Sequence, residues 1–219
     1  MDQLVEAVSA LDPKPRGPRW VSLSSCLIDA VWSIGSNYDA VTVPITRGVF
    51  AACAGDHADP LVPGDDLATP DPIPLDDFTA CFREIEELAA LTNRQRTSPR
   101  GGILKADAAL QYAAVLAGSG VQTRQDGLEL MHDDPRFAEV DARLSRVPGD
   151  GADGVRRGYL WMLLGDDSGI KPDRMVLRWL AFHGANVKAS EASMILRRIA
   201  PHSNCAIRAH RRDNYPMDG

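Results

Sequence analysis

A glycine-bearing turn between two helical patterns is the first feature of this sequence that can do chemistry. Apolar residues at helical spacing run from Val155 to Leu164 and again from Pro172 to His183, where proline suits a first helical turn. Backbone N–H groups at such a turn, with the positive end of the second helix, can hold a phosphate oxygen. An ordinary corner between two helices, with solvated basic side chains, is the alternative. The residues that would form the phosphate site are Gly165, Gly169, Lys171 and Arg174.

An acidic residue within an apolar helix is the second such feature. From Val21 to Ile34 the apolar positions recur at three- and four-residue steps, and Asp29 shares a small polar face with Cys26 and Ser33. This setting is typical of a carboxylate that lines a pocket. A buried aspartate satisfied by neighbouring donors is the alternative.

Three neighbouring residues extend this candidate pocket. Asn37 and Tyr38 follow the glycine turn after the helix, and either can read or stack a base extruded from a duplex. Trp32 lies on the helix itself, where a core position is the first interpretation and a stacking platform the second. Capping and core roles are the alternatives for Asn37 and Tyr38.

The hairpin, with Lys171–Leu180 behind it, resembles the helix-hairpin-helix element of the DNA glycosylase superfamily that includes endonuclease III and the alkyladenine and oxoguanine glycosylases. The segment from Leu27 to Val41 resembles the helix and turn that open onto the base pocket in that superfamily. The likeness covers about residues 20–200. It implies an all-α, glycosylase-like helical bundle, with N-terminal helices, a helical barrel over about 76–150 and the helix-hairpin-helix over 155–184.

The resemblance also implies roles for individual residues. The family's catalytic aspartate follows the hairpin's second helix, and its place falls on Glu191, with Asp29 as the alternative acid. Asp173 occupies the place of the lysine nucleophile of bifunctional members, so a monofunctional enzyme that leaves an abasic site is expected, unless Lys171 supplies the amine. No metal or other cofactor is expected. The family's iron–sulphur cluster is absent, because Cys205 is the only cysteine after Cys81.

Two further functions compete with excision of a damaged or modified base, such as a bulky modified pyrimidine of phage DNA, from double-stranded DNA. The first is a catalytically inactive helix-hairpin-helix module that binds DNA, which the replaced lysine and aspartate positions favour. The second is a helical protein unrelated to nucleic acid. Gly35 and Ser36, being small, would leave room for a bulky base.

The elements that must position these residues are predicted to be helices throughout a single domain, 1–219. Helices are expected over 78–91, 105–117, 125–131, 135–144 and 190–200 as well as those above, nine to ten in all. The run Val41–Ile45 is apolar enough for a strand, but its central proline argues against one. The stretch from Gly55 to Asp77 holds five prolines, seven aspartates and no lysine or arginine. This composition predicts a solvated acidic loop over residues 55–75.

Composition and charge narrow the class of protein. The 219 residues are 44% hydrophobic and 25% charged, which excludes disorder over the whole length. Apolar runs are too short for a membrane span, and Asp2 stands where a secretory signal would carry basic residues, so cytoplasmic residence is expected. A monomer is also expected. The net charge of -6 divides into 5 basic and 15 acidic residues before position 93 and 19 basic and 15 acidic after it. Within that basic half, Arg94, Arg96 and Arg100 form a loop without acids, a candidate DNA contact.

Overall fold

The computed structural model describes residues 2–9, 17–55, 59–150, 154–165 and 174–199. These residues form eleven α-helices and one π-helix, which confirms the all-α class. The chain divides into two compact units, one of residues 16–169 and one of residues 1–15 with 170–219, and the single domain stays a prediction. None of the described helices is long and apolar enough to cross a membrane.

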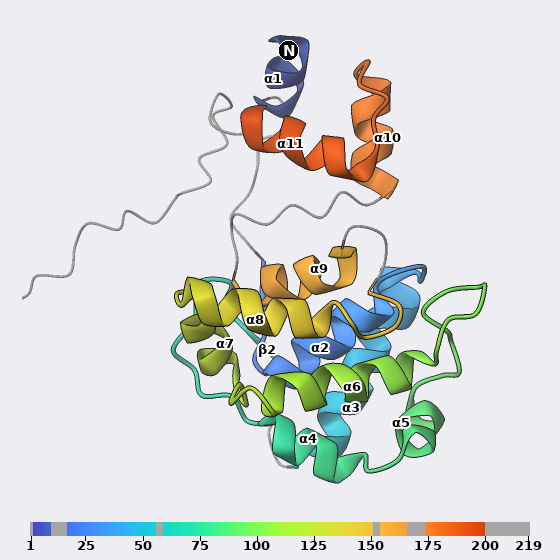
Figure 1. Cartoon of the computed structure of the whole chain (residues 1–219), viewed down its shortest axis with the longest axis vertical. Helices are drawn as coiled ribbons and strands as arrows, with labels where there is room; N and C mark the ends of the chain where they lie inside the picture. Colours follow the sequence, from blue (N-terminus) through green and yellow to red (C-terminus); the bar gives the residue numbers. More distant parts are fainter. Residues whose placement is uncertain (1, 10–16, 56–58, 151–153, 166–173, 200–219) are drawn as a thin grey trace, which may run out of the picture. The chain divides into compact units, whose positions relative to one another are not determined.

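The larger unit, residues 16–169, holds most of the helices (Figure 1). In chain order they are α2 (Leu23–Trp32), the π-helix η1 (Tyr38–Thr42), α3 (Val43–Cys53), α4 (Leu75–Cys81), α5 (Ile85–Leu91), α6 (Lys105–Ala117), α7 (Arg124–Leu130), α8 (Asp134–Leu144) and α9 (Val155–Leu164).

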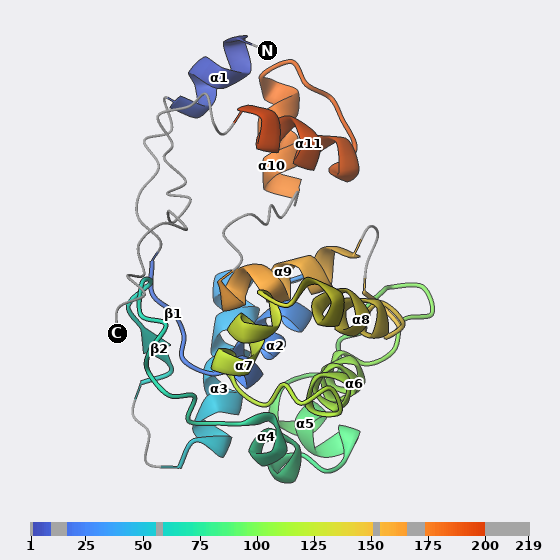
Figure 2. The same ribbon diagram turned by 60° about the vertical axis from the view of Figure 1, so that its left-hand side comes forward.

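Helix α2 is the centre of this unit. Ser22 caps its N-terminus by accepting a hydrogen bond from the Ser25 N–H, and all of its ten residues are buried. Helices α3, α6 and α9 pack against it (Figure 2). Gly35, at φ 73°, turns the chain after the helix as the sequence predicted. Every side chain of α2 therefore faces protein, including its one acid.

The predicted helix over 78–91 is wrong, since two short helices replace it. Phe82 leaves helical geometry at φ -129° and ψ 82°, which ends α4. Glu84 then starts α5 with a capping box, in which the Glu87 carboxylate accepts from the Glu84 N–H and the Glu84 side chain accepts from the Glu87 N–H. The apolar spacing continues across the break, but the local capping bonds stop the helix.

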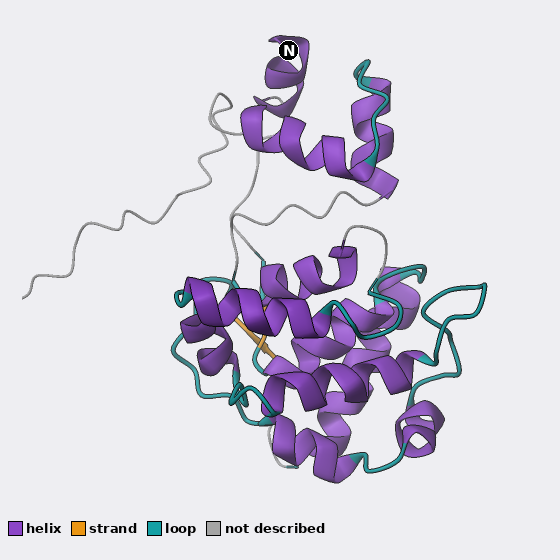
Figure 3. Cartoon of the chain, viewed as in Figure 1, coloured by secondary structure: helices purple, strands orange, loops and turns teal. Residues whose placement is uncertain are grey.

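Two short strands appear where the sequence predicted none. Strand β1 (Arg19–Trp20) pairs antiparallel with β2 (Leu61–Val62), with Trp20 opposite Leu61 (Figure 3). The prediction that Val41–Ile45 is not a strand is confirmed, because this run passes from the π-helix into α3. Strand β2 lies in the acidic segment, whose composition gave no strand signal.

The acidic segment is not simply a solvated loop. The Asp71 carboxylate accepts hydrogen bonds from the backbone N–H groups of Leu23, Ile73 and Arg124, at 2.7, 2.9 and 2.9 Å. Burial raises the pKa of Asp71. The Arg124 side chain is fully buried and donates to the carbonyls of Trp20 and Thr69, both at 3.4 Å. This segment thus fixes the start of α2, which corrects the expectation of a wholly solvated insertion.

The smaller unit contains α1 (Asp2–Ser9), α10 (Arg174–Phe182) and α11 (Ala189–Ile199). Its small core contains Leu4, Leu180, Ala192 and Ile199, one or more from each helix. Gly184, at φ 85°, lies in the turn after α10.

Lys105, the first residue of α6, ties the end of α2 to the loop before α6. Its buried ammonium donates to the carbonyls of Trp32 and Ile34 at 3.0 and 2.9 Å, to Ser36 Oγ at 2.9 Å and to Gln95 Oε1 at 3.1 Å. These four uncharged oxygens share the three N–H groups of the ammonium and take the place of water around a buried cation.

Replacing Lys105 with methionine is expected to lower the free energy of unfolding by about 3 kcal/mol, because the methyl thioether leaves four oxygens without their donor. Urea denaturation followed by tryptophan fluorescence measures this change. Lys188→Met, at an exposed lysine, is the matched control and should change stability by less than about 0.5 kcal/mol. Equal effects of the two substitutions would contradict the structural role of Lys105.

Lys105 also predicts a pH dependence. Burial, and next the charge of Arg156, lowers the pKa of Lys105 from 10.5 to about 8. Between these values the native state loses the proton while the unfolded state keeps it, so the free energy of unfolding should rise with pH. Urea titrations at about pH 7.5 and about pH 10 measure the free energy of unfolding of wild type and of Lys105→Met. The rise between the two pH values should be larger in wild type than in the variant. A wild-type-minus-variant difference that falls or stays flat would refute it.

Candidate functional site

A fully buried carboxylate on α2 is the centre of the candidate site. Asp29 has no solvent-exposed surface, and its Oδ2 atom accepts a hydrogen bond from Trp20 Nε1 at 2.7 Å and from the Tyr38 hydroxyl at 2.8 Å. Asp29 is thus held by one residue of β1 and one of η1.

A second tyrosine completes the cluster. Tyr159, from α9, lies close enough to Asp29 and Tyr38 to interact electrostatically with both. Burial, and next the charge of Asp29, raises the pKa of both tyrosines above the ordinary value of 10. Both hydroxyls therefore keep their protons at neutral pH, and that of Tyr38 remains a donor to the carboxylate.

Local structure orients these donors. Asn37 caps η1 by accepting from the Ala40 N–H at 2.9 Å, and η1 begins at Tyr38. A π-helical turn places its side chains differently from an α-helix and is frequent at functional sites. Pairing of Trp20 with Leu61 fixes the strand that carries the indole. The carboxylate is thereby surrounded from three separate elements.

A cavity of about 340 Å³ lies against this cluster. We call it the tyrosine pocket. Tyr38 is 42% exposed, so one wall reaches solvent, whereas Trp20 is buried. The size is at the lower end of ligand-binding pockets, enough for one planar ring system with a substituent. Its lining residues with large side chains are Arg19, Trp20, Tyr38, Val43, Arg47, Leu61, Tyr159, Met162 and Leu163.

The pocket has a distinct electrostatic pattern. Two arginines line it, Arg19 from β1, whose Nε donates to the Gly64 carbonyl at 2.7 Å, and the exposed Arg47 from α3. The acid that faces the same aromatic side chains is buried behind them. Cations are thus available to an anionic ligand at the pocket, and the carboxylate contributes a negative potential from beneath it.

The structure brings together two of the residues that the sequence singled out. Asp29 and Tyr38 share a hydrogen bond, and Tyr38 lines the pocket. Trp32, Ser33 and Asn37 do not line it: the buried Trp32 donates from Nε1 to Asn93 Oδ1 at 3.2 Å, and Asn37 is the exposed cap of η1. The structure therefore does not place these three residues on the wall of the tyrosine pocket, and their role at a base pocket stays a prediction.

Of the other two candidate acids, only Glu191 falls within the described residues. Glu191 is exposed in the first turn of α11, and its Oε2 accepts from the Lys188 N–H at 2.9 Å, which is a helix-capping role. Asp173 lies outside the described residues, as do Gly169 and Lys171. Of the predicted phosphate site, Gly165 ends α9 at φ 138° and Arg174 begins α10.

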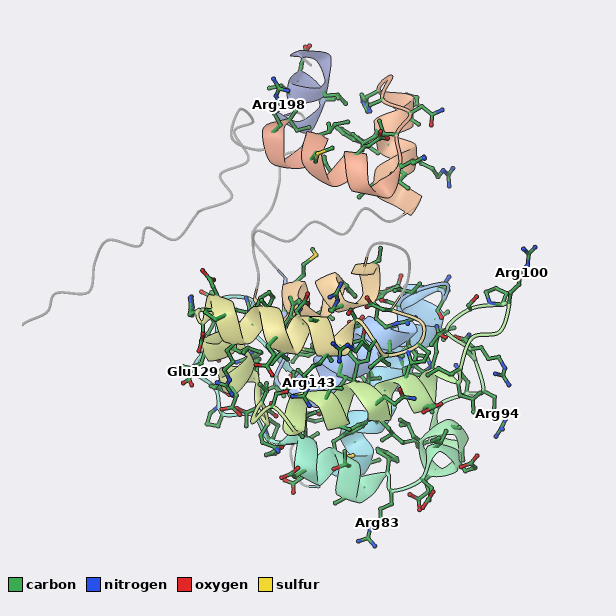
Figure 4. All side chains as sticks on the ribbon, viewed as in Figure 1. Arg83, Arg94, Arg100, Glu129, Arg143 and Arg198 are labelled. Carbon is green, nitrogen blue, oxygen red and sulfur yellow. The ribbon has the colours of Figure 1, made fainter. Side chains whose placement is uncertain are left out.

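The basic loop before α6 is solvent-exposed. Arg94 and Arg100 extend away from the helices (Figure 4), and Arg96 donates from Nη1 to the Gly102 carbonyl at 2.7 Å. A bridge between Arg96 and Leu104 closes the loop. The guanidinium groups of this loop are accessible to a polyanion. That of Arg96 also holds the loop together through its hydrogen bond to Gly102.

Sequence reasoning missed Trp20, Tyr159 and Arg47. Trp20 precedes the apolar periodic segment, and its strand partner lies about 40 residues away, so no local pattern marks it. Tyr159 had a recognisable signal, a tyrosine inside an otherwise apolar run, because a buried hydroxyl needs a partner.

The described residues define a helical protein with a buried carboxylate beneath an aromatic, arginine-lined pocket. The sequence profile of a family described as "Domain of unknown function (DUF8548)" matches residues 1–210, and the chain belongs to that family. Neither a curated protein nor a solved structure matches the chain.

Removing the carboxylate should destabilise the unit of residues 16–169. Asp29→Ala is expected to lower its free energy of unfolding by about 3 kcal/mol, because the indole N–H and the Tyr38 hydroxyl lose their acceptor. Tyr38→Phe, which removes one donor to the charge, is expected to cost about 1.5 kcal/mol. Chemical denaturation measures both values, with Asp39→Ala, at an exposed acid one position after Tyr38, as the control. A null effect of Asp29→Ala would show that the network contributes nothing to stability.

Proposed function

We propose that this protein is a monofunctional DNA N-glycosylase whose tyrosine pocket receives a base turned out of the duplex. The supporting observation is the hydrogen-bonded Asp29 beneath that pocket. The resemblance of the α2 region to the pocket-opening helix of helix-hairpin-helix glycosylases points to the same place in the chain.

The pocket suits a nucleobase in size and chemistry. Aromatic side chains stack on the face of any base, and the remaining lining side chains are mostly apolar. Arg19 and Arg47 can contact the flanking phosphates, which position a strand without reading its sequence. An apolar pocket of this kind favours a base with a bulky substituent, such as a modified pyrimidine of phage DNA, over one that must be read by many hydrogen bonds.

The reaction needs stabilisation of positive charge on the sugar. As the glycosidic C–N bond breaks, its electron pair leaves with the base and the anomeric carbon becomes cationic. Water then adds to that carbon and its surplus proton neutralises the released base. A carboxylate held in a preorganised environment lowers the energy of such a cation. Asp29 would act across the Tyr38 hydroxyl that it orients.

The complete burial of Asp29 favours a second candidate, a DNA-binding module without catalysis. A carboxylate with no exposed surface, satisfied by a tryptophan and a tyrosine, also fits a purely structural anchor for the pocket wall. Such a module would bind duplex DNA with strongly salt-dependent affinity and release no base.

Base release from a panel of DNAs separates these functions. The panel holds ordinary, damaged and phage-modified duplexes, with abasic sites scored chemically and released bases identified by mass spectrometry. Wild type is expected to release one class of base, Asp29→Asn to lose at least about 100-fold in rate, and Glu191→Gln to keep it. Loss in Glu191→Gln with retention in Asp29→Asn would transfer the role to Glu191. Binding without release from any DNA would establish the module instead.

The arginines of the pocket give a prediction that holds for both functions. Arg47→Ala should weaken duplex binding for every sequence and reduce the slope of log affinity against log salt by about 1, as loss of one phosphate contact does. Arg83→Ala is the matched control, because Arg83 is exposed between α4 and α5 and does not line the pocket. Equal slopes for wild type and Arg47→Ala would remove the pocket from the DNA contact.

A further inference from the structure

A second hollow, of about 290 Å³, lies between α6 and α8, and we call it the arginine hollow. The described residues that line it all differ from those of the tyrosine pocket. Gln111 and Val115 belong to α6, Arg143 belongs to α8, and Arg146 and Val147 follow α8. The two helices pack against each other, so the walls of the hollow belong to one packed unit.

The Arg143 guanidinium is held in place at this hollow. Its Nη1 donates to Ser119 Oγ at 2.7 Å, and the Ser119 hydroxyl donates in turn to the Val115 carbonyl at 2.7 Å. Figure 4 shows Arg143 between α8 and α6. Its Nε and Nη2 groups have no hydrogen-bond partner among the described residues, and the exposed Glu139, one turn before it, forms no ion pair with it there. Oriented N–H groups are therefore available to a ligand at little further entropic cost.

Arg146 brings a second guanidinium to the same hollow. Its backbone N–H donates to the Arg143 carbonyl at 3.2 Å, so the chain turns after α8 and both side chains reach the hollow. The Arg146 side chain is exposed and has no partner among the described residues. Basic side chains near a helix C-terminus also complement the helix dipole, but that role requires neither a hollow nor a fixed guanidinium.

The charge at the hollow is not balanced by its own walls. None of the described residues that line it is acidic. Of the acids on the two helices, Asp141 forms an ion pair with Arg157 at 2.6 Å, and Asp107 accepts from Gln111 Nε2 at 2.8 Å. The hollow therefore has a positive potential that favours an anionic ligand.

We propose that the arginine hollow binds the phosphate group of a nucleotide, either free or within a DNA strand. Guanidinium groups match phosphate oxygens through paired N–H···O hydrogen bonds, and two of them border this hollow. The hollow has more room than one phosphate needs, and Val115 and Val147 give it an apolar wall for the attached sugar. This site goes beyond the proposed function, because it shares no lining residue with the tyrosine pocket and requires no base release.

Nuclear magnetic resonance of the full chain, with labelled valine methyl groups, tests the site directly. Deoxythymidine monophosphate and a short DNA duplex are titrated separately at constant ionic strength. The methyl signals of Val115 and Val147 should shift to saturation with at least one of these probes. A response to the mononucleotide identifies a free nucleotide as a ligand, and a response to the duplex alone identifies a phosphate of the DNA backbone. Neither titration involves base release, so a wrong glycosylase assignment would leave this test unaffected.

Arg146→Gln is the decisive variant, because this exposed side chain has no partner among the described residues and its loss should leave the fold intact. The dissociation constant obtained from the two valine signals should rise at least about tenfold. Arg83→Gln, which removes the same charge from an exposed residue outside the hollow, should change that constant less than about twofold. Unshifted valine signals with both probes, or equal effects of the two substitutions, would overturn the proposal.

Discussion

The buried charge of Asp29 is the constraint on which the larger unit depends. A carboxylate inside protein is tolerable only where polar groups replace its water, and Asp29 accepts hydrogen bonds from Trp20 and Tyr38 with Tyr159 close by. These residues belong to β1, η1 and α9, so one acid on the central helix fixes three elements that are distant in sequence. The pocket exists because these three elements converge on that acid.

Three other charged side chains also hold the ends of α2 in place through hydrogen bonds. Asp71 accepts from the first residue of the helix, Arg124 donates to the Trp20 carbonyl just before it, and Lys105 donates to the carbonyl of its last residue. Each charge joins an end of α2 to a loop whose sequence is poor in apolar residues. Hydrogen bonds from charged groups supply specificity there that hydrophobic packing cannot. The position of the pocket-forming strand thus follows from polar contacts.

Local patterns in the sequence were sufficient for most helices and insufficient for the pocket. The spacing over Lys105–Ala117 matches α6 residue for residue, and the polar face of α2 drew attention to Asp29, which the structure buries beneath the pocket and not on its wall. Helical spacing gave the wrong prediction near Phe82, because the Glu84 capping box starts a new helix while the apolar residues keep their three- and four-residue spacing. Trp20 could not be found at all, since its partners lie on other elements and only tertiary structure unites them.

The environments of the two candidate acids argue for different roles. Glu191 is exposed and already occupied in capping α11, so water and salt would screen its charge from a reacting sugar. Asp29 is removed from solvent, and the field of a buried charge extends further through protein than through water. Its donors, Trp20 and Tyr38, also form the pocket wall, so a ligand in contact with these rings lies one side chain away from the carboxylate. A rigid wall alone could be built with an apolar side chain at position 29, without burying a charge. The presence of a buried acid there is therefore the strongest physical reason to look for chemistry at the tyrosine pocket.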